Sequence, residues 1–236
     1  MFKLKYLKYK KKYLNLKNNL KGGNNNAQPN DIFSAVENDN EELVRNLIVN
    51  NRGVVDQIND QGDTPLFIAI KNFNIRMINL LIENRATINL FANGRTALHI
   101  FIDTFIKDLS QAEDLLNALI DGGAKANSLD LHNINVLSYF IMNVLHKEDK
   151  LTSNNLTQDE VSEDDALNSR EKIYINLLKI LISSIPEGKI IEAIDHEDFN
   201  NISVFDYLNN RGGYIGNIFK QIFINAKNTE TNKLTK

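Results

Sequence analysis

The chain has 236 residues, 42% of them hydrophobic, and a formal net charge of −3, which is enough apolar content to bury a continuous core. It has no cysteine, which excludes disulfide bonds and thiolate chemistry and fits a reducing, intracellular setting. The sequence has no run of about 18 apolar residues, and its first residues lack the apolar segment of a secretion signal. We therefore expect neither a transmembrane helix nor secretion.

The start of the chain is strongly basic. Its first 30 residues carry eight lysines and no acidic residue, a charge of +8, and because the whole chain carries −3 the remainder carries −11. Apolar side chains recur here alternately four and three residues apart, which is the spacing of a heptad seam; they are Phe2, Tyr6, Tyr9, Tyr13, Leu16 and Leu20. We predict a basic amphipathic helix that ends at Gly22-Gly23, with an asparagine-rich linker to residue 29.

Three interpretations of this basic helix remain open. It packs on the rest of the protein or on a partner helix, which the seam favours; it lies on an anionic membrane surface; or its lysines bind the phosphates of a nucleic acid. Tyr6, Tyr9 and Tyr13 fit the seam better than they fit a base-stacking platform. The sequence therefore predicts the helix more firmly than its role.

The next segment, residues 30–58, reads as a pair of helices. Ile32 to Asn38 and Glu42 to Asn50 are the expected helices, and the second has Leu43, Leu47 and Ile48 on its apolar side. No hairpin precedes the pair, as suits the first, capping member of a repeat array.

Residues 59–127 contain two copies of one pattern. Thr64–Ala69 (TPLFIA) and Thr96–Phe101 (TALHIF) lie 32 residues apart, and each is followed by a polar break and a second apolar helix. Their apolar residues recur at three and four residues, so each helix buries one stripe. Because a pair of such helices cannot bury its stripe alone, neighbouring pairs must stack.

The start of each copy has residues suited to a hairpin followed by a helix. Gly62 and Gly94 supply the positive φ that a tight hairpin tip requires. Thr64 and Thr96 stand where a helix N-cap belongs, and Pro65 occupies the first helical position, where no N–H is needed.

The pattern resembles the ankyrin repeat, which has a T-P-L-H-x-A stretch and a period of roughly 33 residues. Asn89 and Asn127 also stand four residues after Arg85 and Gly123, as in the closing G-A-x-x-N turn of that family. The resemblance implies an all-α solenoid in which His99 is a structural hydrogen-bonding residue. It also implies structural roles for a set of positions, namely Gly62, Thr64, Pro65, Leu66, Gly94, Thr96, Leu98, His99, Gly123 and Ala124.

Weaker copies continue the array. Asn133 and Asn201 stand at the glycine position, and Asn135 and Ser203 at the capping position. The last expected helix carries a one-sided stripe (Ile215, Ile218, Phe219, Ile222 and Phe223) and polar residues elsewhere (Asn217, Lys220 and Gln221), as suits a terminal cap.

We therefore predict an ankyrin-repeat domain over residues 30–225, preceded by the segment 1–29 and followed by a disordered tail, 226–236. Its five repeats span about residues 30–58, 59–89, 90–127, 128–194 and 195–225. The third has six residues inserted near Thr104 to Ser110, and the fourth contains an acidic segment, 147–170, expected to be a mobile loop. The alternative is that this segment hides a degenerate extra repeat.

The sequence contains no recognisable arrangement of catalytic or metal-binding residues. The four histidines, His99, His132, His146 and His196, belong to separate repeats. The run Asp195–Asp198 offers carboxylates for a metal or for hydrolysis, but adjacent side chains in a hairpin point to opposite faces, which favours a solvated turn. We predict no catalytic, metal or cofactor site and no small-molecule substrate.

A stacked scaffold without such a site is most simply a binding module. The family resemblance implies a protein partner on a concave face made of hairpin tips and inner helices. The matching positions are Asp60, Gln61, Asp63, Lys71, Asn72, Ala92, Asn93, Arg95, Asp103 and Thr104. Apolar tip residues of the later repeats are further candidate anchors, unless these tips fold down onto the insertion; they are Leu131, Ile134, Phe199 and Ile202.

Two further resemblances concern the setting. The basic segment ending at Gly22-Gly23 looks like a leader on proteins of giant viruses that infect amoebae, and Gly22-Gly23-Asn24 resembles a viral maturation cleavage site. The high content of Asn, Ile and Lys, 84 of 236 residues, fits an AT-rich genome. This implies a viral protein in the host cytoplasm or virion. Ile185–Ile191 faintly resembles the opening of an F-box, which gives the alternative of an adaptor for a ubiquitin ligase.

Overall fold

The computed structural model describes residues 31–152, 169–210 and 214–234. The predicted helix and linker of residues 1–29 lie outside these ranges, and so do residues 153–168 of the acidic segment. The chain divides into two compact bodies, residues 1–97 and 98–236, which we call the N-terminal and C-terminal body and describe separately. The described residues form helices, turns and isolated bridges, with no β-strand among them.

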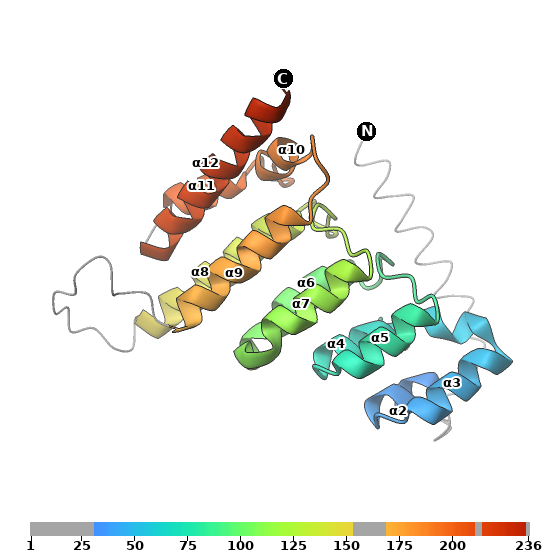
Figure 1. Ribbon diagram of the computed structural model, residues 1–236. Coiled ribbons are helices and arrows are strands. Elements are labelled where there is room, and N and C mark those ends of the chain that lie inside the picture. Colours follow the sequence, from blue (N-terminus) through green and yellow to red (C-terminus); the bar gives the residue numbers. More distant parts are fainter. Residues whose placement is uncertain (1–30, 153–168, 211–213, 235–236) are drawn as a thin grey trace. The chain divides into compact units, whose positions relative to one another are not determined.

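The N-terminal body consists of two helix pairs, which lie side by side in Figure 1. They are α2 (Ile32–Glu37) with α3 (Glu41–Asn50), and α4 (Pro65–Lys71) with α5 (Ile75–Glu83), joined by the 3-10 helix η1 (Arg52–Asp56). The pairs pack through α2 and α4. Val44, Ile70 and Ile78 are fully buried in this core, as expected for helices that each hide one stripe.

Every α-helix of the N-terminal body begins with a side-chain cap. Asp31 accepts a hydrogen bond from the Ser34 amide (2.7 Å), and Thr64 accepts one from the Phe67 amide (3.1 Å), with Pro65 next to it at the first helical position. Asn40 and Asn74 cap α3 and α5 in the same way. Such caps contribute about 1 kcal/mol each, which is substantial for helices of 6 to 10 residues.

Two links within these pairs have a conformation that the sequence did not indicate. Asp39 (φ 53°) and Phe73 (φ 54°) adopt left-handed backbone conformations between the paired helices. Phe73 is unusual there, because its Cβ makes this conformation costly. The amides of Phe73 and Asn74 bond to the carbonyls of Ile70 and Ala69, so the turn is held by the end of α4.

The C-terminal body continues the pattern of paired helices (Figure 1). Its elements, in chain order, are α6 (Ala97–Thr104), η2 (Phe105–Lys107), η3 (Leu109–Gln111), α7 (Ala112–Asp121), α8 (Val136–Thr152), α9 (Ser169–Ser183), α10 (Ile190–Ile194), α11 (Val204–Asn210) and α12 (Tyr214–Leu234). The helix α8 packs on α9 and α11, and α12 packs on α9, α10 and α11.

The six-residue insertion of the third repeat forms the short helices η2 and η3. Its first residue, Phe105, is fully buried and stacks on Phe101 (5.4 Å between ring centroids) and Phe140 (5.7 Å). Tyr174 meets the same ring edge-on at 6.0 Å. The insertion therefore contributes to the core of the C-terminal body, since aromatic pairs of this geometry add to the burial of apolar area.

Parts of two expected irregular segments are helical. Residues 147–152 continue α8, and Ser169 and Arg170 begin α9, so both ends of the expected acidic loop belong to helices. The disordered tail expected from residue 226 is wrong for residues 226–234, which continue α12. This polar stretch is ordered because it contacts α10 and the last hairpin.

Glu230 accounts for much of that contact. Its side chain is 2% exposed, and its two carboxylate oxygens accept hydrogen bonds from the amides of Ile190 (3.0 Å) and Ile191 (2.6 Å), at the start of α10. Lys227 pairs with Asp195 (2.7 Å) from the same helix. A carboxylate 40 residues away thus satisfies the orphan amides of a five-residue helix.

Replacing Glu230 with alanine should selectively loosen α10. Two half-buried amides lose their acceptor, which costs about 1–2 kcal/mol, so amide hydrogen exchange at Ile190 and Ile191 should accelerate about tenfold. The control is Asn228→Ala, at an exposed position of the same helix, which should leave both rates unchanged. Equal exchange rates in the Glu230→Ala and wild-type proteins would show that this cap does not hold α10.

Candidate functional site

Three of the hairpin tips are held by an asparagine or aspartate at their first position. The Asn59 side-chain oxygen accepts hydrogen bonds from the amides of Gln61 (3.0 Å) and Asp63 (2.8 Å). Asp130 and Asp198 make the equivalent pair of bonds, two and four residues onward, in their own tips. This role was not predicted from the sequence, although each residue stands three positions before the glycine or asparagine of its tip.

The tip of the third repeat is tighter. Ala92 and Arg95 form a bridge, and between them Asn93 (φ 48°) and Gly94 (φ 80°) both have positive φ, which is the backbone of a two-residue type I′ hairpin. In the later tips, Asn133 (φ 63°) and Asn201 (φ 57°) adopt the left-handed conformation that Gly62 (φ 85°) has in the second repeat. The expected substitution of asparagine for glycine is confirmed.

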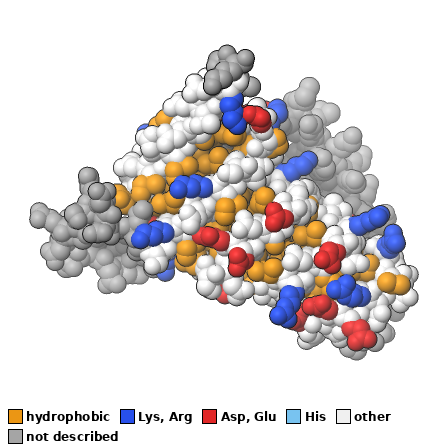
Figure 2. All heavy atoms as spheres, viewed as in Figure 1, with side chains coloured by type: hydrophobic (Ala, Val, Ile, Leu, Met, Phe, Trp, Pro, Cys, Tyr) orange, Lys and Arg blue, Asp and Glu red, His pale blue; other side chains and the backbone are white. Residues whose placement is uncertain are grey.

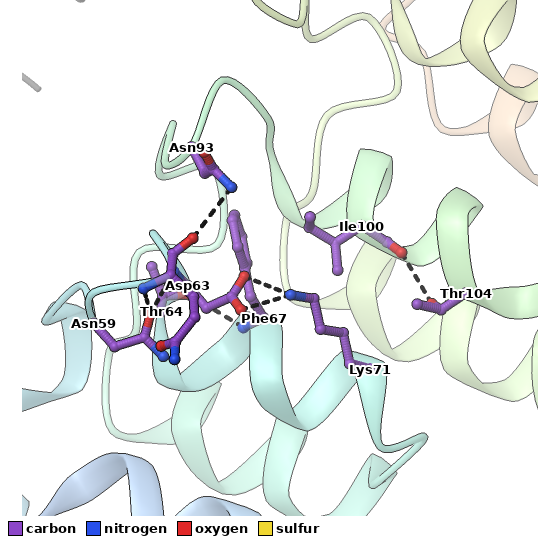
Figure 3. A network of polar contacts seen from close by, with 9 residues as sticks. Asn59, Asp63, Thr64, Phe67, Lys71, Asn93, Ile100 and Thr104 are labelled. Carbon is purple, nitrogen blue, oxygen red and sulfur yellow. Dashed lines mark hydrogen bonds and ion pairs between the residues drawn. The ribbon is translucent and has the colours of Figure 1, made fainter. Parts of the chain in front are cut away.

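Neighbouring tips within each body are tied together by asparagine side chains. In the N-terminal body, Asn93 (labelled in Figure 3) donates from its side-chain amide to the Gln61 carbonyl (3.3 Å). In the C-terminal body, Asn133 donates to the Glu197 carbonyl (3.0 Å), and His196 Nε2 lies 2.8 Å from the Asn133 carbonyl. These contacts fix the spacing of successive tips.

A polar pocket of about 430 Å³ lies beside the first tip of the N-terminal body. It is lined by the ends of α2 and α4 and by the tip itself, through Glu37, Asn59, Gln61, Asp63, Ile68, Lys71 and Asn72. Lys71 reaches across to Asp63, with its Nζ 2.7 and 2.6 Å from the two carboxylate oxygens (Figure 3). The Asp63 charge is therefore already neutralised by a residue of the same pocket.

Four other polar side chains around this pocket are exposed and have no bonding partner among the described residues. Glu37, Asp60, Gln61 and Asn72 are exposed, and their side chains have no hydrogen bond or ion pair with any described residue. Such groups do not contribute to the fold, so they are available to a ligand.

The predicted contact residues are distributed between the two bodies. Eight of the ten lie in the N-terminal body, and four of these (Gln61, Asp63, Lys71 and Asn72) line the pocket. Asp60 is exposed beside the pocket, while Asn93 lies in the next tip and Arg95 follows it. In the C-terminal body, Asp103 is half-buried and accepts a hydrogen bond from the Tyr139 hydroxyl (2.7 Å). Glu37, Asn59 and Ile68 are pocket residues that the sequence analysis did not select.

Two of the predicted contact residues are wrong. Ala92 is 0% exposed, because it begins the tight hairpin and points into the core. Thr104 is 4% exposed, and its hydroxyl donates to the carbonyls of Ile100 (2.9 Å) and Phe101 (3.0 Å), one turn earlier in α6. Neither residue presents a surface to a partner. Asp63, at 8% exposed, acts through its contact with Lys71 and not as a free carboxylate.

The positions assigned to the repeat scaffold are mostly buried. In the N-terminal body Gly62, Thr64, Pro65, Leu66 and Thr96 are buried and Gly94 is half-buried. In the C-terminal body Leu98, His99 and Ala124 are buried, whereas Gly123 is exposed, with φ 91°. The His99 ring lies edge-on to Tyr139, and its Nε2 is 3.4 Å from the Ile134 carbonyl. His99 thus links its helix to the next tip.

The remaining candidates of the sequence analysis have structural surroundings. Among the apolar tip residues Phe199 is 53% exposed, while Leu131, Ile134 and Ile202 are half-buried. In the run Asp195–Asp198, the first carboxylate pairs with Lys227 and the last accepts the amides of its own tip. The described residues include no group of three or more metal-binding side chains.

The segment Ile185–Ile191 also belongs to the scaffold. Ile185 is buried, and the amides of Ile190 and Ile191 are capped by Glu230.

The fold defines an all-α protein built of stacked helix pairs connected by hairpins. The family model for ankyrin repeats (3 copies) matches residues 32–130, and this part of the chain is an ankyrin-repeat array. Ankyrin repeats generally mediate protein–protein interactions. No curated protein matches the chain. Among the described helices, none has both the length and the apolar character needed to span a bilayer.

Gly62 should be the least replaceable tip residue of the N-terminal body. A Cβ at this position would lie 2.9 Å from Cβ and Cγ of Asn93, and the residue has φ +85°. Gly62→Ala should therefore cost about 1–2 kcal/mol from backbone strain and about 1–3 kcal/mol more from overlap with the next tip.

Gly188→Ala is a control for backbone strain alone, because Gly188 has φ +79° but no atom lies within 4 Å of its added Cβ. Thermal unfolding followed by circular dichroism should show the larger loss for Gly62→Ala. Equal losses in the two variants would mean that the contact between tips is not tight.

Proposed function

We propose that the chain is a non-catalytic interaction module that binds a partner protein on the polar pocket of its N-terminal body. The observation that carries this proposal is the grouping of Glu37, Asp60, Gln61 and Asn72, exposed and without partners among the described residues, around a pocket of about 430 Å³. Buried scaffold residues fix the elements that bear them. The general role of ankyrin repeats in protein interactions supports the same conclusion.

The chemistry of the pocket favours an extended polar segment of the partner. Carboxylates and side-chain amides offer acceptors and donors at the tip and at the end of α4, while Ile68 supplies a small apolar floor. Interfaces of this kind gain specificity from hydrogen bonds that a wrong partner leaves unmade. Lys71, held by Asp63, is a fixed part of the wall (Figure 3).

We further propose a viral setting, with action on host or virion components. The support is the resemblance of the basic segment ending at Gly22-Gly23 to leaders of giant amoeba-infecting viruses, together with the Asn-, Ile- and Lys-rich composition. The alternative of an F-box-like adaptor rests on the faint resemblance of Ile185–Ile191 alone. The scaffold also accounts for the packing of this segment, so we favour the interaction module.

A photo-crosslinking amino acid at Gln61 tests the pocket directly. In cells that naturally make the protein, it should yield one discrete partner adduct. Adding Asn72→Arg, which fills the pocket with a bulky cation, should reduce the adduct about tenfold or more, the effect of losing roughly 1.4 kcal/mol at a central contact.

Asn79→Arg is the matched control, since Asn79 is an exposed asparagine on α5, outside the pocket lining. It should leave the adduct unchanged. If no adduct forms at Gln61, or if both arginine variants reduce it equally, the pocket is not the binding surface. Circular dichroism of each variant establishes that the helices are intact.

A further inference from the structure

The pocket of the N-terminal body has an unbalanced charge. Its lining contains one cation, Lys71, and that cation is neutralised by Asp63 at 2.6 Å. Glu37 in the lining and Asp60 beside it are exposed carboxylates with no ion-pair partner among the described residues. The lining of the pocket, together with Asp60, therefore carries an excess negative charge.

The face of the same body seen in Figure 2 differs, because acidic and basic side chains are interspersed on it. Elsewhere in this body, Glu41 and Arg45 form an ion pair along α3 at 3.7 Å. A cationic segment is therefore attracted more strongly to the pocket than to this mixed surface.

The chain itself contains a segment of matching charge. Its first 30 residues carry +8 with no acidic residue, and they join the N-terminal body at Asp31, which caps α2. Glu37 is the last residue of that six-residue helix, about 9 Å from its start. Lys21 lies ten positions before Asp31, and ten extended residues span up to about 33 Å, so Lys17 and Lys21 can reach both carboxylates.

We propose that the pocket of the N-terminal body is occupied by the lysine-rich first 21 residues of the same chain. The lysines pair with Glu37 and Asp60, and the segment covers the polar groups of the pocket. If the segment docks here, it competes with a partner protein for the same surface. This competition, unlike the docking, rests on the proposed function. Docking itself requires only the charges and the length of chain described above.

Zero-length crosslinking of the full chain with a carbodiimide tests the contact, because this reagent joins a lysine amine to a carboxylate with loss of water. Mass spectrometry should find Lys17 or Lys21 joined to Glu37 or Asp60. The Lys71–Asp63 pair, at 2.6 Å, is an internal positive control. Mixing isotope-labelled and unlabelled protein distinguishes links within one chain from links between two.

Tryptic cleavage after Lys17 and Lys21 gives a second measurement that does not depend on the crosslinked atoms. Glu37→Gln combined with Asp60→Asn should accelerate this cleavage about fivefold, since an exposed ion pair changes an equilibrium by up to about that factor. The matched control is Glu42→Gln with Glu83→Gln, which removes the same charge from two exposed positions outside the pocket lining. Its cleavage rate should equal that of the wild type. About 0.5 M salt should accelerate cleavage of the wild type but not of the pocket variant.

Three outcomes would overturn the proposal: crosslinks spread evenly over the exposed carboxylates, crosslinks only between different chains, or equal cleavage of the two double variants. The first would indicate that the basic segment belongs to another partner, such as a membrane or a nucleic acid. Neither measurement involves a partner protein. If docking fails, the Gln61 adduct still tests the proposed function independently. If the Gln61 adduct is absent, the docking of the basic segment is not contradicted.

Discussion

The structure depends on one constraint, which is that a pair of short helices cannot bury its apolar stripe by itself. The α-helices of the N-terminal body have 6 to 10 residues, too short to be stable in isolation. Each pair is completed by its neighbour, as α2 is by α4 in the N-terminal body and α8 by α11 in the C-terminal body. Stacking thereby turns marginal helices into a cooperative scaffold.

This constraint determines where sequence is free to vary. Inner-helix positions such as Leu66 and Ala69 are buried, and the hairpins carry their own backbone hydrogen bonds through Asn59, Asp130 and Asp198. The side chains of Asp60 and Gln61, in the tip held by Asn59, form no hydrogen bond with any described residue. Exposed residues there are available for recognition, which is why the pocket lies at the junction of a tip and two inner helices.

The predictions from sequence succeeded where a residue determines the backbone conformation or hydrogen bonding of its immediate neighbours in the chain. A helix cap is indicated locally by Thr64 and Pro65, and a positive φ by Asn133 and Asn201. The repeat array was therefore predictable from spacing and turn chemistry. The double acceptor at Asn59 was equally local, and a search for Asn or Asp three residues before each tip glycine would have found it.

Two of the misses, Glu230 and Phe105, involve partners distant in sequence. Glu230 caps a helix 40 residues away, and nothing near it distinguishes the end of α12 from a polar tail. Phe105, within an apparent insertion, stacks on Phe140 and Tyr174. Ala92 and Thr104 were assigned to a surface by position in the repeat, and the tight Asn93-Gly94 hairpin and the α6 backbone bonds bury them instead. The pocket was half predicted, because Glu37 of the first repeat meets the residues of the second repeat only through stacking.

The ion pair between Lys71 and Asp63 has a consequence for binding at this pocket. By neutralising each other, these residues leave Glu37 and Asp60 to set the charge that an occupant meets. The basic start of the chain and a partner protein would then bind the same carboxylates, so the binding of one would oppose the binding of the other. If the segment occupies the pocket about 80% of the time, the apparent affinity for a partner falls about fivefold, because only the open fraction can bind. A change of that size would make the first residues of the chain a regulator of the surface that the repeats hold in place.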